Sequence, residues 1–93
     1  MNFRNSKLHN ANFIGSRLDG SDFQKADLSN SILIGTDLRH ANLKDAILTG
    51  ANVAQCMISE NSLKYFQPYK NTLRHIEKLI IFMEDGTIKY SLD

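Results

Sequence analysis

The chain has 93 residues, of which 42% are hydrophobic and 23% charged, and its formal net charge is +1 at pH 7. A chain of this length forms one small domain, and its near-neutral charge provides no strong field that would attract nucleic acid or an acidic membrane surface. The single cysteine, Cys56, excludes a disulfide bond within the chain.

A five-residue repeat begins at the first residues and continues to about Ile58. Every fifth residue from Phe3 is large and apolar, and the residue two positions before each of them, from Ser6 onward, is small. The large positions are Phe3, Leu8, Phe13, Leu18, Phe23, Leu28, Leu33, Leu38, Leu43, Leu48, Val53 and Ile58. Neither a helix, with period 3.6, nor a flat strand, with period 2, produces this pattern. The repeat predicts a solenoid, an architecture that offers binding surfaces more often than catalytic pockets.

Each repeat unit is expected to be a very short extended segment closed by a corner. The large and small residues are two positions apart, so both point inward, because alternate residues of an extended segment share a face. The position two after each large residue is rich in asparagine and glycine, which tolerate the backbone angles of a sharp corner: Asn5, Asn10, Gly15, Gly20, Asn30, Gly35 and Gly50.

Consecutive units such as Ala11-Asn12-Phe13, Ser21-Asp22-Phe23 and Ala41-Asn42-Leu43 make residues 1–61 resemble the pentapeptide-repeat family. The resemblance implies an all-β fold, a right-handed quadrilateral β-helix in which four units complete a coil of 20 residues, so that the segment forms about three coils. Three residues depart from the family pattern by placing apolar side chains where asparagine or aspartate is expected: Ile32, Ile47 and Met57.

The charged residues provide an independent test of the 20-residue coil. At this spacing, opposite charges face each other in the pairs Lys7–Asp27, Arg17–Asp37, Asp19–Arg39 and Lys25–Asp45. We expect these exposed ion pairs to form a ladder that fixes the register, although each stabilises the fold by only a few tenths of a kcal/mol up to ~1 kcal/mol.

The N-terminal end of this solenoid has open backbone groups and the edges of Phe3, Leu8, Phe13 and Leu18. An uncovered sheet edge pairs readily with another chain. Either this end pairs in an oligomer, or the chain begins where another segment covers it.

Residues 62–93 have a different composition and are expected to form a C-terminal capping or oligomerisation segment. Asp85-Gly86 is a strong two-residue turn signal and predicts a β-hairpin over residues 78–92. The predicted register pairs Met83 with Ile88, Ile81 with Tyr90 and Leu79 with Leu92, which makes one hairpin face wholly apolar. The alternative is an amphipathic helix over residues 72–83; we favour the hairpin.

Outward apolar residues gather on one side of the predicted coil. Ile14, Ile34 and Ala54 fall at the same outward position of successive coils, with Ile32 on the same side and with Ile47 and Met57 on the two flanking sides. A contiguous apolar column on a polar solenoid suggests a contact surface. We interpret it as a dimer or partner interface; the alternatives are that the C-terminal segment folds back over it, or that it has no special role.

No catalytic site, cofactor or metal site is expected. His9, His40 and His75 are the only imidazoles and have no partner at nucleophile or metal spacing. Cys56 takes the small inward position, which indicates a buried structural thiol. The longest apolar run, residues 79–83, is too short to cross a bilayer, and the N-terminus lacks a secretory signal, so we expect a cytoplasmic protein without a membrane partner.

The sequence therefore predicts a non-enzymatic module that binds or inhibits another protein, self-associates as a homodimer, and does not bind nucleic acid. The family resemblance adds an alternative, because some pentapeptide-repeat proteins mimic DNA and bind type II topoisomerases such as gyrase. That mimicry needs dense negative charge, whereas residues 1–61 contain equal numbers of acidic and basic side chains. Inhibition of another DNA-acting or defence enzyme is a further form of this alternative.

Overall fold

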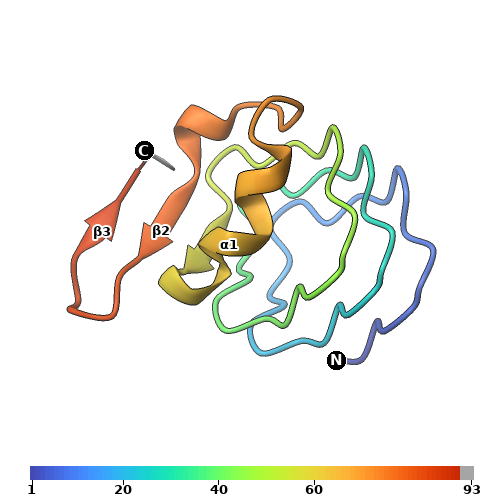
Figure 1. Cartoon of the computed structure of the whole chain (residues 1–93), viewed down its shortest axis with the longest axis horizontal. Helices are drawn as coiled ribbons and strands as arrows, with labels where there is room; N and C mark the ends of the chain where they lie inside the picture. The colour runs from blue at the N-terminus through green and yellow to red at the C-terminus, as the bar shows by residue number, and fades with distance from the viewer. Residues whose placement is uncertain (91–93) are drawn as a thin grey trace.

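The five-residue units form a coil whose successive turns stack in parallel, 20 residues apart (Figure 1). The structure is a computed structural model and describes residues 1–90. Parallel bridges define four sides: Asn2–Asp22–Asn42 on the first, Lys7–Asp27–Ile47 on the second, Asn12–Ile32–Asn52 on the third and Arg17–Asp37–Met57 on the fourth. The predicted 20-residue spacing is therefore confirmed.

The corners recur at every fifth residue and have a left-handed backbone conformation. Asn5 and Asn10 both have φ 62°, and Gly15 and Gly20 have φ 67° and 72°. Lys25, His40 and Gln55 also adopt this conformation, at φ 57–62°. The coil thus imposes the corner geometry even on residues that do not favour it, because the stacked turns stabilise it from both sides.

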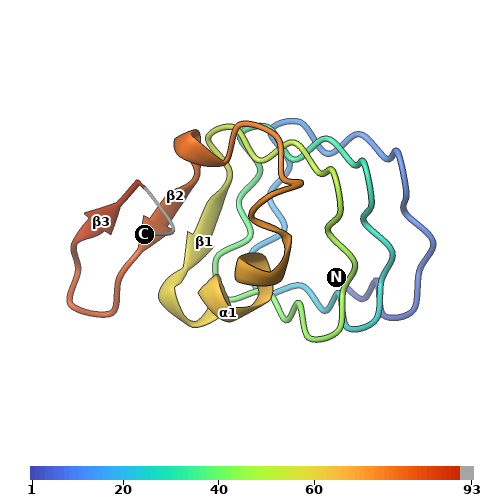
Figure 2. The same cartoon turned by 45° about the horizontal axis from the view of Figure 1, so that its top comes forward.

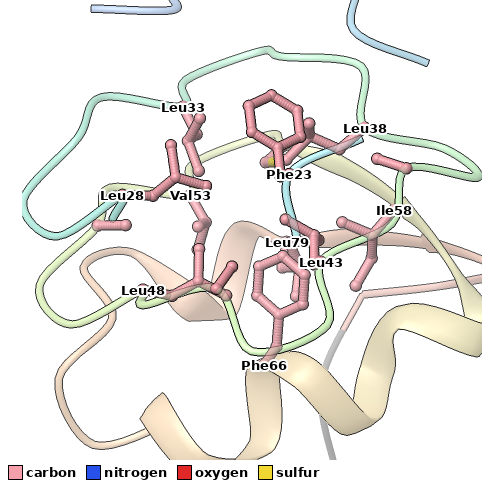
Figure 3. Packing of buried hydrophobic residues seen from close by; sticks show 14 of the residues in the cluster. Phe23, Leu28, Leu33, Leu38, Leu43, Leu48, Val53, Ile58, Phe66 and Leu79 are labelled. Atoms are coloured by element: carbon pink, nitrogen blue, oxygen red, sulfur yellow. The ribbon is translucent and has the colours of Figure 1, made fainter. Parts of the chain in front are cut away.

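The interior is filled by the large residues of the repeat (Figure 3). From the second turn onward they are fully buried, at 0% exposure: Phe23, Leu28, Leu33, Leu38, Leu43, Leu48, Val53 and Ile58. In the first turn, by contrast, Phe3, Leu8 and Phe13 are only partly buried. The ring of Phe3 stacks on that of Phe23, with centroids 4.8 Å apart. The core therefore continues to the N-terminal end, where it is incompletely covered.

A helical segment follows β1 (Met57–Ser59) and interrupts the repeat. It consists of η1 (Glu60–Ser62), α1 (Leu63–Phe66) and η2 (Gln67–Tyr69). Phe66 is fully buried in the core beside the large residues of the third turn (Figure 3), and the Tyr69 hydroxyl donates to the Ala46 carbonyl at 3.3 Å. The segment thus packs on the third turn in place of further repeat units.

After this segment the chain resumes parallel pairing with the third turn. Arg74 bridges to Asn52, and β2 (Ile80–Phe82) pairs with β1, Met57 with Ile80. Between these contacts lie a left-handed His75 and η3 (Ile76–Lys78). Parallel pairing therefore extends beyond residue 61. The helix alternative over residues 72–83 is wrong, because this segment contains only the short η3 and the strand β2.

The predicted hairpin exists, but its register differs by one residue. β2 pairs antiparallel with β3 (Ile88–Lys89), so that Phe82 faces Ile88 and Ile81 faces Lys89, in a three-stranded mixed sheet of order β1-β2-β3 (Figure 2). The Met83 N–H donates to the Thr87 carbonyl, and Gly86 has φ 91°. The loop thus has three residues with a left-handed glycine at its end, and the one-residue change moves Ile88 and Tyr90 to the opposite face.

Candidate protein-interaction surface

The third side of the coil carries the apolar column predicted from the sequence. Ile14, Ile34 and Ala54 stack at equivalent positions, because the Gly15 N–H donates to the Ile34 carbonyl and the Gly35 N–H to the Ala54 carbonyl, each at 2.9 Å. Ile14 is 56% exposed, while Ile34, Ala54 and the neighbouring Ile32 are partly buried. The coil therefore aligns four of the predicted residues on one side.

At its C-terminal end the column is followed by a cation. The Gln55 N–H donates to the Lys78 carbonyl at 2.9 Å, in the same way that Gly35 donates to Ala54. Lys78 therefore takes the next position along the column and is exposed. Since Ile14 remains exposed, the part of the C-terminal segment that the structure describes does not fold back over the column.

The other two predicted interface residues lie on separate sides. Ile47, at 43% exposure, is on the second side, and Met57 on the fourth side is partly buried beside its bridging partner Ile80. They flank the third side in the third turn, as the repeat predicts, but they do not join one continuous patch with Ile14.

The six residues predicted for capping or oligomerisation divide into three groups. Leu79 and Ile81 are fully buried and Met83 packs against the core, whereas Ile88 and Tyr90 are 46% and 60% exposed. Leu92 lies outside the described residues. Because of the one-residue register change, Ile88 pairs with Phe82 and not with Met83, the partner expected from the predicted register. Only the length of the loop before Thr87 distinguishes the two registers.

The ion pairs differ from the predicted ladder. Arg4 pairs with Asp22 at 3.0 Å, and Arg39 pairs with Asp37 at 2.9 Å. Within residues 1–90, no ion pair joins Lys7 to Asp27 or Arg17 to Asp37, although the backbones of these residues are bridged. That part of the prediction is wrong, because a long arginine side chain reaches another carboxylate on its own side, in the same turn or the next, as easily as the one directly above it.

These carboxylates are held in the ionised form by hydrogen bonds. Two side-chain hydrogen bonds from Arg39 lower the pKa of Asp37, and the backbone N–H of Gln24 is the main cause of a lowered pKa at Asp22. Asp37 in turn raises the pKa of Arg39, with a smaller contribution from Asp19. Asp22 and Asp37 are therefore both paired with protein donors.

Candidate catalytic groups do not assemble into a site. The Oγ of Ser59 lies 3.4 Å from Nδ1 of His40 and accepts the His40 backbone N–H at 3.0 Å. Glu60 accepts a hydrogen bond from the Glu84 N–H. Burial raises the pKa of the Cys56 thiol, which leaves it unreactive. Residues 1–90 contain no cluster of metal-ligating side chains.

Comparisons with known proteins agree with the repeat. A family model for pentapeptide repeats matches residues 1–33 and 21–59, with eight copies. A solved structure of a pentapeptide repeat protein from the thylakoid lumen of Arabidopsis thaliana is 26% identical, with a TM-score of 0.60. The match covers 62% of this chain and 42% of that one. A search of curated proteins finds no match, and no helix in the described part of the chain is long and apolar enough to span a membrane.

Proposed function

Because the chain belongs to the pentapeptide-repeat family, whose fold is a right-handed β-helix, we propose that it is a non-enzymatic protein–protein interaction module. It forms about three coils, and the C-terminal segment after residue 61 acts as their cap. It binds a partner protein through the third side and also self-associates.

The exposed isoleucine column carries this proposal. Ile14 is more than half exposed, and Ile34 and Ile32 lie beside it on a coil whose other outward positions are mostly polar. A bound partner would remove this apolar surface from water, which is favourable by roughly 25 cal/mol per Å² of buried area.

The DNA-mimic alternative has less support. Mimicry of a duplex requires unpaired negative charge at regular spacing, whereas Asp22 and Asp37 are neutralised by Arg4 and Arg39. Inhibition of a DNA-acting or defence enzyme through the third side would be a form of the proposed function. The cytoplasmic location expected from the sequence stays a prediction.

The test is capture of a partner from extract by the tagged chain, compared with two aspartate variants. Ile34→Asp places a charge in the column, and Thr49→Asp places the same charge at the equivalent repeat position on the second side, where Thr49 is exposed. We expect Ile34→Asp to lose the captured protein and Thr49→Asp to retain it, with unchanged β-sheet circular dichroism in both. Equal capture by the two variants would contradict binding through the third side.

A further inference from the structure

The first turn of the coil has unused backbone hydrogen-bonding groups along one edge. In the second turn, Asp27 uses both of its backbone groups toward the first turn: its N–H donates to Ser6 at 2.9 Å and its carbonyl accepts from Leu8 at 2.8 Å. The corresponding groups of the first turn belong to Asn2, Lys7, Asn12 and Arg17, and no hydrogen bond among residues 1–90 uses them. Free edges of this kind pair with other strands.

The same edge has an incompletely covered core. Phe3, Leu8 and Phe13 are partly buried, whereas Phe23, in the same column as Phe3, is at 0% exposure. Burying both the side chains and the edge requires a partner that presents a similar ring of backbone groups around an apolar centre. A second copy of this chain has such a ring.

The two ends of the molecule are different, which limits how copies can stack. The end opposite the first turn is occupied by α1 and the β2–β3 hairpin (Figures 1 and 2), and Phe66, Leu79 and Ile81 there are fully buried. Head-to-tail stacking would require this end to open. The arrangement that remains is isologous: both copies use the same surface, and the assembly closes as a dimer.

We propose that two copies bind head to head through their first turns. The copies are related by a two-fold axis that is perpendicular to the coil axis. This inference deepens the self-association included in the proposed function and assigns it to the N-terminal edge, away from the third side. The two-fold axis makes facing strands antiparallel, so that Asn2, Lys7, Asn12 and Arg17 each exchange two backbone hydrogen bonds with a residue of the other copy, about eight in all.

The helical rise of the coil selects one pairing among those that a two-fold axis allows. Each residue of the edge lies further along the coil axis than the one before it. In a head-to-head dimer, the axial distance between two facing residues therefore increases with the sum of their residue numbers. All facing pairs are equally far apart only when this sum is the same for every pair. That condition places Asn2 opposite Arg17 of the other copy and Lys7 opposite Asn12. The other two-fold pairings leave some strands apart by about one turn, ~4.8 Å.

Charge and side-chain size agree with this pairing. Both cations of the edge, Lys7 and Arg17, face asparagines of the other copy. A two-fold axis that passed through the middle of a side would instead place cations of the two copies opposite each other, which is destabilising. The pairing also places large inward residues against small ones of the other copy: Phe3 against Ser16, Leu8 against Ala11 and Phe13 against Ser6. The two uncovered cores can therefore interdigitate.

The first test is the dimer dissociation constant, measured for the full chain by sedimentation equilibrium. Asn12→Asp places a carboxylate opposite Lys7 of the other copy, twice per dimer, and keeps the acceptor that Asn12 offers to the Ile14 N–H. We expect the dissociation constant to fall by about threefold to tenfold at low salt. When Lys7→Glu is added to Asn12→Asp, two carboxylates face each other, so the dissociation constant of the double variant should rise above that of the wild type.

Asn52→Asp is the matched control, because Asn52 has the same repeat position on the same side and offers the same acceptor, to the Ala54 N–H. It adds the same charge two turns from the edge and should leave the dissociation constant unchanged. Equal effects at positions 12 and 52 would overturn the proposed pairing, and a monomer at all concentrations would overturn the dimer.

Hydrogen exchange provides a second test that does not depend on variants. The amides of Lys7, Asn12 and Arg17 bond to nothing in the described protomer, so they should exchange fast at low concentration and slowly in the dimer. Ile34→Asp should keep this concentration dependence even if it loses partner capture. A dimer in which these three amides stay fast, or which Ile34→Asp dissociates, would assign self-association to another surface and overturn the inference.

Discussion

Ser31 and Thr36 occupy the same small inward position of the repeat, but their hydroxyl groups are used differently. The Thr36 Oγ1 donates to the Phe13 carbonyl at 2.6 Å, which ties the second turn to the first. The Ser31 Oγ is buried without a hydrogen-bond partner among the described residues. An unpaired buried hydroxyl is destabilising, since it loses its bonds to water and gains none.

Removing these two hydroxyls should therefore have opposite effects on stability. We expect Ser31→Ala to raise the free energy of unfolding by about 1 kcal/mol, and Thr36→Val to lower it by about 1 kcal/mol. Urea unfolding with an unchanged slope measures both. A loss of stability in Ser31→Ala would mean that its hydroxyl has a partner in solution.

The bidentate pair of Arg39 with Asp37 makes stability depend on pH. Because its folded pKa is lowered, Asp37 stabilises the fold above its unfolded pKa, about 3.9, and this stability is lost as the pH falls through the folded value. We expect the wild type to lose stability as the pH falls below about 4, and Asp37→Asn to be less stable at neutral pH with a flatter acid profile. Thermal unfolding across this range measures the difference.

Asp45→Asn is the control for this pH effect, because Asp45 is exposed and forms no ion pair within residues 1–90. It should follow the wild-type acid profile. An Asp37→Asn profile parallel to the wild type would show that other carboxylates determine acid stability.

Sequence reasoning predicted which residues fill the core but not which charges meet. The large and small residues must recur every five positions for turns to stack, so their inward placement can be derived from spacing alone. Arg4 and Arg39 have long side chains at the surface of the coil. Whether they pair with Asp22 and Asp37 or with other carboxylates depends on rotamers that differ by little in energy. Spacing carries no information about such choices.

A corner residue closes each five-residue unit. Gly50 and Gly20 are both corner residues, but their surroundings differ. Both have left-handed backbones, with φ 71° and 72°. A Cβ at position 50 would collide with the Asn30 side chain, whereas a Cβ at position 20 would meet no atom within 4 Å. The two positions therefore separate backbone strain from steric conflict.

We expect Gly20→Ala to lower the free energy of unfolding by about 1–2 kcal/mol, which is the cost of a left-handed conformation with a Cβ, and Gly50→Ala to lower it by more. Urea unfolding of both variants measures the difference. Equal losses would indicate that the Asn30 side chain moves aside at little cost.

The β2–β3 hairpin illustrates what an element-level pattern leaves undetermined. Asp85-Gly86 correctly indicates a turn, but the same dipeptide fits a two-residue loop or the end of a three-residue loop. The three-residue loop is the one formed, and Ile81, fully buried, faces Lys89 in consequence. The apolar content of β3 could not decide the register, because Ile88 and Tyr90 are both large and lie on one face in either case.

The exposed column shows the same limit for the candidate site. The 20-residue spacing correctly aligned Ile14, Ile34 and Ala54, since stacking follows from the repeat. The arrangement of residues 60–82, in contrast, follows no period, so the sequence could not show that Lys78 continues the column or that Phe66 enters the core. Non-repeating contacts depend on tertiary packing that local patterns do not encode.

At the scale of the whole molecule, stability should be graded along the coil. In a solenoid each turn contacts only its neighbours, so its stability is a sum of nearest-neighbour terms. The second turn is covered on both sides, and the third lies between the second turn and residues 60–82, with Phe66 at 0% exposure. The first turn contacts only the second within the described protomer.

Amides that join the first and second turns should therefore exchange with solvent sooner than those that join the second and third, when the chain is dilute enough to be monomeric. The N–H groups of Leu8 and Phe13 represent the first interface, and those of Leu28 and Leu33 the second, with donor–acceptor distances of 2.8 Å in all four cases. Since these hydrogen bonds are equally short, a difference in exchange rate reports turn opening and not bond length.

Phe66→Ala should speed exchange mainly at Leu28 and Leu33, because it uncovers the third turn while leaving the first unchanged. Uniform protection in the wild type would instead mean that the coil opens as one cooperative unit, so that the N-terminal edge is as rigid as the centre.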